Sequence, residues 1–193
     1  MNIQNQENFE HVEFDGIQDV KDIKSKTFLN CSFKDCDFTE SDFSLSRFSD
    51  CRFHNCNLSL IVVSETKLQD VCFDSCKIMG VDFTLINKLI FKIDFQESQI
   101  IKCSFSELDM SESDFQNCII QQSDFYQSKL VKSNFTGSDL QDTIFDNSDL
   151  TEADFTDAKN YAINPLNNKI KNAQFSMPDA IQLLNALNIK IYL

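Results

Sequence analysis

The sequence predicts an all-β solenoid with four sides, and three observations support this fold. Bulky apolar residues recur every five positions along most of the 193 residues, and a short fixed period is typical of stacked repeats. From residue 95 to residue 155, phenylalanine alternates with an aliphatic residue at these positions. The residue two positions before each bulky one is nearly always small. A period of five fits neither an α-helix nor a flat strand, so we expect a corner at every repeat.

The alternation indicates that each coil of the solenoid contains four repeats of five. One phenylalanine ladder would then contain Phe95, Phe115, Phe135, Phe155 and Phe175, and a second would contain Phe105, Phe125 and Phe145. With three repeats per coil, phenylalanine would stack on aliphatic residues and the alternation would have no packing role. Residues two apart in an extended chain point to the same side, so each bulky residue and its small partner are expected to point inward.

We expect one domain composed of five segments. Residues 1–22 are predicted to form an N-terminal cap, residues 23–83 a first repeat block and residues 95–175 a second repeat block. The separation of Phe83 and Phe95 exceeds a multiple of five by two, so residues 84–94 are predicted to break the register. Residues 176–193 are predicted to form a C-terminal α-helix, with Ser176 as its N-cap, followed by a short strand.

The cysteines follow the repeat. Of the eight cysteines, all but Cys72 occupy the small inward position: Cys31, Cys36, Cys51, Cys56, Cys76, Cys103 and Cys118. A buried free thiol packs like a small apolar side chain, so we expect these residues to be core residues and not metal ligands or disulfides.

The sequence offers little for catalysis. His11 and His54 have no evident nucleophile partner, and three glycines are too few for a glycine-rich phosphate loop. The prediction is therefore a protein without catalytic, cofactor-binding or metal-binding residues. Residues 1–16 lack the basic and apolar runs of a signal peptide, and no apolar run is long enough for a membrane span, so we expect a cytoplasmic protein that does not contact a membrane.

The charge pattern is the main functional signal. The net charge is −13, and residues 137–157 contain seven acids and no base. These acids are Asp139, Asp142, Asp146, Asp149, Glu152, Asp154 and Asp157. Such a field repels nucleic acid and attracts basic grooves. Two interpretations stay open: the charge keeps a phenylalanine-rich column soluble, or it lets the rod occupy a groove built for DNA without binding nucleic acid itself.

Short runs in the repeats carry a family resemblance. Cys-Asp-Phe-Thr-Glu at 36–40, Ser-Asp-Phe-Ser-Leu at 41–45 and Ala-Asp-Phe-Thr-Asp at 153–157 resemble the pentapeptide-repeat family. The resemblance covers roughly residues 21–175 and implies a right-handed quadrilateral β-helix. Residues 160–165 and 169–175 are similar to the C-terminal part of the Qnr-type quinolone-resistance and microcin-immunity branch.

That resemblance implies a partner. Proteins of this branch bind DNA gyrase or topoisomerase IV and protect it from quinolones or peptide toxins, although this chain lacks the long inserted loops of the Gram-negative Qnr proteins. They dimerise through a C-terminal helix and strand, which here would use Ile181, Leu184, Leu187, Ile189, Ile191 and Leu193. From the residues alone, the tail either only caps the last coil or also pairs two chains. The alternative function is a structural protein-interaction scaffold with an unknown partner.

Overall fold

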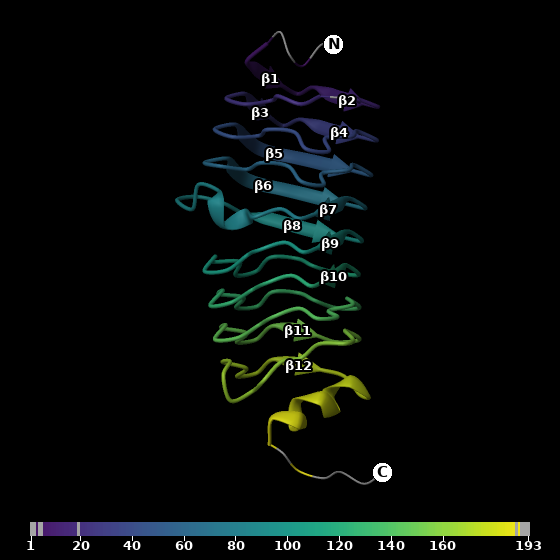
Figure 1. Cartoon of the computed structure of the whole chain (residues 1–193), viewed down its shortest axis with the longest axis vertical. Helices are drawn as coiled ribbons and strands as arrows, with labels where there is room; N and C mark the ends of the chain where they lie inside the picture. The colour runs from purple at the N-terminus through teal and green to yellow at the C-terminus, as the bar shows by residue number, and fades with distance from the viewer. Residues whose placement is uncertain (1–2, 4–5, 19, 188, 190–193) are drawn as a thin grey trace.

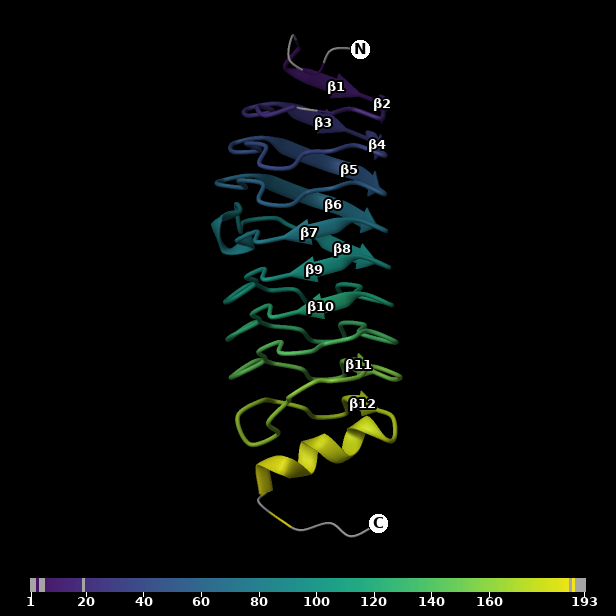
Figure 2. The same cartoon turned by 45° about the vertical axis from the view of Figure 1, so that its right-hand side comes forward.

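The structure is a computed structural model of the chain and describes residues 3, 6–18, 20–187 and 189. The described residues form a β-solenoid of about 8 turns with one helix at its C-terminal end (Figure 1). Successive coils lie one above another, with the strands stacked as parallel neighbours, and a second view shows the same column (Figure 2). The predicted all-β solenoid is confirmed.

Short parallel strands join neighbouring coils into three sheets. The strands are β1 Asn8–Glu10, β2 Glu13–Asp15, β3 Thr27–Leu29, β4 Ser32–Lys34, β5 Arg47–His54, β6 Lys67–Asp74, β7 Lys77–Met79, β8 Ile93–Gln96, β9 Gln99–Ile101, β10 Ile119–Gln121, β11 Asp154–Phe155 and β12 Gln174–Phe175. The described residues also form the 3-10 helices η2 Phe83–Leu85 and η3 Asp179–Leu187. One sheet holds β1–β6 and β8, a second holds β7, β9 and β10, and the third pairs β11 with β12. Isolated parallel bridges connect the remaining coils.

Strand pairing gives each regular coil four repeats, as the alternation predicted. Phe28 pairs with Phe48, and Ile100 pairs with Ile120. The N-terminal segment, expected as a cap, adds another coil to the column. Its Phe9 pairs with Phe28, one residue short of the regular spacing, because β1 and β3 lie in register across a slightly shorter coil.

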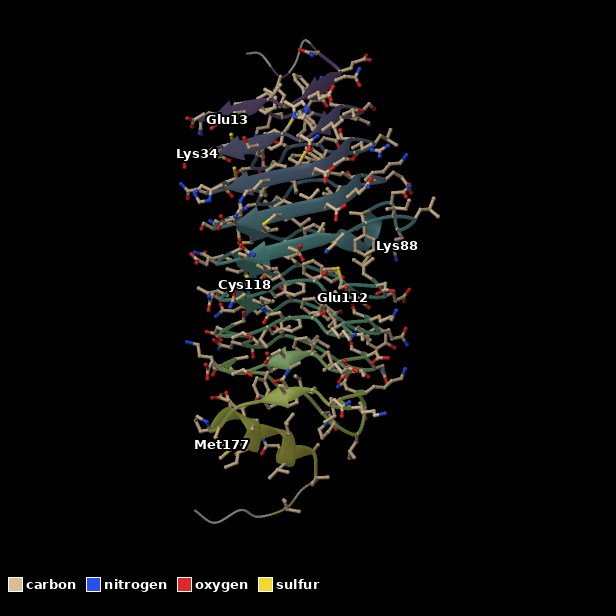
Figure 3. All side chains as sticks on the ribbon, turned by 180° about the vertical axis from the view of Figure 1, so that it is seen from behind. Glu13, Lys34, Lys88, Glu112, Cys118 and Met177 are labelled. Atoms are coloured by element: carbon tan, nitrogen blue, oxygen red, sulfur yellow. The ribbon has the colours of Figure 1, made fainter. Side chains whose placement is uncertain are left out.

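The register changes by two residues in the middle of the column. Phe73 pairs with Phe95, two positions beyond the regular spacing. The backbone of Asn87 still bonds to Thr66, whereas Lys92 bonds to Leu68, so the extra residues lie between Asn87 and Lys92. We call residues 87–92 the bulge. It projects sideways from the column (Figures 1 and 2), with Lys88 at its rim (Figure 3).

The phenylalanine ladders form the core. One ladder contains nine rings, with stacked neighbours 4.5–5.3 Å apart between centroids. Its members are Phe14, Phe33, Phe53, Phe73, Phe95, Phe115, Phe135, Phe155 and Phe175. The second ladder meets the first edge to face, as where Phe105 approaches Phe115 at 6.2 Å and 84°. Both stacked and edge-to-face pairs are favourable for aromatic rings.

The small inward residues bond to the coil before their own. Ser128 Oγ donates to the Phe105 carbonyl at 2.7 Å, and Cys56 Sγ approaches the Phe33 carbonyl at 3.4 Å. Buried donors need such acceptors, and the carbonyls of the preceding coil supply them. The seven cysteines predicted to point inward are buried, whereas Cys72 is half-buried, so their predicted place in the core is confirmed.

The corners use a backbone conformation that sequence reasoning did not foresee. Among the described residues, 26 non-glycine residues have positive φ, nearly all of them two positions after a bulky residue. At several corners the amide three positions after the bulky residue bonds back to it, as Thr66 does to Val63 at 3.1 Å. This is the pattern of a turn with positive φ at its third residue. The frequent Asn, Asp and Gly at this position were the available signal.

The predicted C-terminal helix is present, but its turns are 3-10 and not α. Three residues per turn place Ala180, Leu183 and Ala186 in one row, and Leu183 packs against the core. Ser176 does not cap the helix with its side chain: Ser176 Oγ accepts a hydrogen bond from the Asp157 amide at 2.7 Å and so ties the helix to the last regular coil. The predicted terminal strand lies outside the described residues except for Ile189.

Candidate functional site

The acidic residues 139–157 form one complete coil, which we call the acidic coil. Asp139 pairs with Lys159 of the next coil, so the acids between them are distributed round the column. Asp139 and Asp142 flank Leu140, Asp146 follows Phe145, Asp149 and Glu152 flank Leu150, and Asp154 and Asp157 flank Phe155. Because Leu140, Phe145, Leu150 and Phe155 belong to four different sides, the acids form a ring and not a stripe along the rod.

Three of the seven acids stabilise the fold locally. Asp149 accepts hydrogen bonds from the Thr151 amide at 3.2 Å and hydroxyl at 2.6 Å, and its other oxygen lies 3.1 Å from Lys169 Nζ. Asp154 accepts from the Thr156 amide at 2.8 Å, and Asp139 accepts from the Asn160 side chain at 2.8 Å. These carboxylates are half-buried and committed to turns or neighbouring coils.

The environment of Asp149 changes its acidity. Partial burial acts to raise the pKa of the Asp149 carboxyl. The hydrogen bonds from Thr151 and the Lys169 ammonium act in the opposite direction and together outweigh burial, so the pKa lies below its usual value. Asp149 is therefore charged at neutral pH.

The other four acids are more accessible, although Glu152 lies 3.9 Å from Lys132 Nζ and the Asp157 carboxylate accepts a hydrogen bond from Ser176 Oγ at 3.4 Å. Asp142, Asp146, Glu152 and Asp157 are exposed. Three of them occupy corner positions with φ of 58–60°, which place these residues at the edges of the column. These four residues are the part of the predicted acidic surface that is available for contacts.

Lysines of neighbouring coils partly neutralise the negative charge of the acidic coil, and they do so on some sides more than on others. On the Leu150 side, Asp109, Lys129, Asp149 and Lys169 follow one another, and ion pairs of 3.0 and 3.1 Å join Lys129 to Asp109 and Lys169 to Asp149. Lys132 Nζ also lies 3.9 Å from Glu152. Sequence reasoning missed this partial neutralisation because the partners belong to adjacent coils and are distant along the chain.

The C-terminal end exposes apolar side chains. Leu184 and Leu187 of η3 are 37% and 46% exposed, and Ile189 beyond it is 55% exposed, whereas Ile181 is half-buried. Ile191 and Leu193, also predicted to form a dimer contact, lie outside the described residues. An open pocket of about 300 Å³ separates η3 from the loop at 162–164, lined by Ala162, Ile163, Asn164, Gln182, Asn185 and Ala186.

In the part of the chain that the structure describes, no three His, Cys, Asp or Glu side chains come together as a metal site. The described helices include none with the length and apolar character needed to cross a bilayer.

Comparisons with known proteins agree with the fold. Two trypsin-treated variants of QnrB1, described as a plasmid-mediated fluoroquinolone resistance protein, align over 96% of this chain and 100% and 92% of their own, with TM-scores of 0.62 and 0.65 and identities of 14% and 16%. HetL from the cyanobacterium Nostoc aligns over 91% of this chain and 93% of its own, with a TM-score of 0.43 and 12% identity. HetL is described as a pentapeptide repeat protein involved in the regulation of heterocyst differentiation.

Sequence comparison identifies the family. No curated protein matches the sequence of this chain. The sequence model for the pentapeptide repeat region matches residues 26–100 and 90–155, which together make up more than half of the chain. The chain therefore belongs to the pentapeptide-repeat family.

Proposed function

We propose that this chain is a non-enzymatic DNA mimic that engages DNA gyrase or topoisomerase IV as a homodimer and protects it from quinolones or peptide toxins. The observation that carries the proposal is the acidic coil with its four exposed carboxylates, close to an exposed apolar end. Such a surface favours a basic groove over nucleic acid, since the chain carries a net charge of −13. A cytoplasmic location follows from the proposed partner.

The position of the acidic coil supports this proposal. β11, at the end of the acidic coil, pairs directly with β12, and η3 follows β12. Only one coil therefore separates the acids from the C-terminal end. Tail-to-tail pairing of two chains would form a longer rod with one acidic coil on each side of its centre. The negative charge near the centre would then be twice that of a single chain.

The exposed residues at the C-terminal end support pairing of two chains. Leu184, Leu187 and Ile189 are exposed beyond Leu183, which alone of the η3 leucines packs against the core. Clustered exposed apolar side chains commonly mark a protein-protein contact. In the proposal, Ile181, Ile191 and Leu193 complete this contact with the same residues of a second copy.

A scaffold with a different partner is the second candidate. The alternating Asp–Lys column on the Leu150 side favours it, because ion pairs of 3.0 and 3.1 Å make that side less negative than the sequence suggests. A partner that docks there would need mixed charge and not a DNA-binding groove.

The two candidates are separated by assays of gyrase supercoiling and of topoisomerase IV decatenation. Each purified enzyme is assayed with increasing amounts of this protein, with and without a fluoroquinolone. The proposal predicts inhibition of the enzyme at high protein concentration, or restored activity in the presence of the drug. Unchanged activity of both enzymes under both conditions contradicts the topoisomerase proposal and leaves the scaffold.

A further inference from the structure

The bulge carries a second candidate binding surface, far from the acidic coil. Leu89 and Ile90 are 88% and 70% exposed, whereas the next residue, Phe91, is half-buried and packs against the core. Exposing two large apolar side chains to water costs free energy in proportion to their exposed apolar area.

Two cationic side chains lie beside the bulge, one in each of two neighbouring coils. Arg47 of β5 and Lys67 of β6 are paired residues in adjacent strands, so their backbones are about 4.8 Å apart. Among the residues that the structure describes, neither has a carboxylate within ion-pair distance. Arg47 is held by neutral partners instead, Ser49 Oγ at 3.0 Å and Gln69 Oε1 at 3.2 Å.

Cations are arranged differently further along the rod. There, acidic and basic residues alternate from coil to coil. Lys129 contacts Asp109 at 3.0 Å, and Lys169 contacts Asp149 at 3.1 Å. Stacking Arg47 on Lys67 places like charges opposite each other, which is unfavourable in a sheet. The alternating column thus shows how this fold neutralises a lysine, and the two cations beside the bulge lack that neutralisation.

These features meet in one pocket of about 170 Å³, lined by Arg47, Lys67, Gln69, Asn87, Leu89 and Ile90. It therefore combines two cations, two amides and two apolar side chains. An acidic group also contacts the lining: the Glu65 carboxylate accepts a hydrogen bond from the Asn87 side chain at 3.3 Å. That bond holds Glu65 on Asn87, and no ion pair joins it to either cation among the described residues.

We infer that this pocket binds a short acidic peptide segment in which carboxylates and apolar side chains are adjacent. A carboxylate of the segment contacts Arg47 and Lys67, and a neighbouring apolar side chain covers Leu89 and Ile90. A nucleic-acid backbone fits less well, because Leu89 and Ile90 form part of the lining and the net charge of −13 opposes a polyanion. The inference does not depend on the proposed topoisomerase function.

The test uses a fluorescein-labelled peptide of alternating glutamate and leucine, with its glutamine-leucine counterpart as control, and fluorescence anisotropy with the full chain. The acidic peptide is expected to bind, and to bind more weakly as salt rises. Replacing both cations, Arg47→Ser with Lys67→Ser, is expected to weaken binding about tenfold, the sum of two exposed charge pairs. Replacing Leu89→Ser with Ile90→Ser is expected to weaken it as well.

A matched variant further along the rod provides the control. Lys129→Ser with Lys169→Ser removes two cations that are already paired, and is expected to leave binding unchanged. Circular dichroism shows that each variant keeps the solenoid. No binding by the wild type, equal binding of the glutamine peptide, an equal loss in the control variant, or displacement of the peptide by a short DNA duplex would each overturn the inference.

Discussion

Removing one ring from the middle of the long ladder should cost more than removing the ring at its end. Phe135 is fully buried and stacks on Phe115 at 4.7 Å and Phe155 at 4.9 Å. It also meets Phe125 and Phe145 edge to face at 6.0 and 5.7 Å. Phe135→Ala leaves a cavity enclosed on both sides by rings that the backbone ladders hold in place, so we expect a loss of about 3–5 kcal/mol in the free energy of unfolding.

The matched comparison is Phe175→Ala at the C-terminal end of the same ladder. Phe175 is only half-buried and stacks on one side, on Phe155 at 5.1 Å. Less apolar area is lost and water can enter the space, so the expected cost is about 1–2 kcal/mol.

Urea unfolding followed by circular dichroism measures both variants. A solenoid can unfold in segments, so the slope of each transition is compared with that of the wild type before free energies are taken. Equal costs for the two variants, or a cost for Phe135→Ala below about 1 kcal/mol, would refute the claim that stacked rings form an enclosed core.

Three further predictions test the thiols, the corners and the C-terminal end. Burial raises the pKa of the Cys51 and Cys103 thiols from 9.0 to about 11, so the unfolded chain ionises first and the free energy of unfolding should fall as pH rises above 9.0; Cys51→Ser with Cys103→Ser should flatten that slope in urea titrations. Gly137→Ala should lower the free energy of unfolding by about 1 kcal/mol, because the added Cβ would lie 2.4 Å from Asn117 Oδ1. Asn117→Gly in the same chain should recover part of that stability, and no rescue would contradict the steric explanation. Leu184→Glu with Leu187→Glu should reduce the mass in light scattering from two chains to one, whereas Leu183→Glu should instead lower the melting temperature. A wild-type mass of one chain would exclude the proposed dimer, and an unchanged two-chain mass in the first variant would exclude the proposed contact.

The sequence predicted the column because its signal is local and periodic. One bulky and one small residue in every five determine which side chains point inward, and the alternation of phenylalanine with aliphatic residues determines the four sides. Phe135 and Ser133 could therefore be placed in the interior before the structure was known, and both are fully buried.

The candidate surfaces were less predictable because they depend on residues one coil apart. The run of seven acids is visible along the chain, but its distribution over four sides and the pairing of Asp149 with Lys169 depend on the coil. In the same way, Arg47 and Lys67 gave no signal until the strand register placed them side by side. The local sequence pattern also did not predict that the C-terminal helix is 3-10. The side of η3 that contains Leu183 packs against the core, and this contact depends on tertiary structure.

The most direct test of the proposed function neutralises only the exposed acids of the acidic coil. The variant combines Asp142→Asn, Asp146→Asn, Glu152→Gln and Asp157→Asn, and leaves Asp139, Asp149 and Asp154 in their turns. The control removes four exposed acids elsewhere: Glu40→Gln, Asp50→Asn, Glu65→Gln and Asp70→Asn. Asparagine and glutamine already occupy corners with positive φ in this chain, at Asn117 and Gln122, so both variants should keep the fold.

Both variants carry the same net charge, so only the location of the lost charge differs between them. In the gyrase supercoiling assay, with and without a fluoroquinolone, we predict that the acidic-coil variant loses the effect of the wild-type protein and that the control variant keeps it. Equal activity of the two variants, or loss of the effect in the control alone, would contradict the claim that the acidic coil takes the place of DNA.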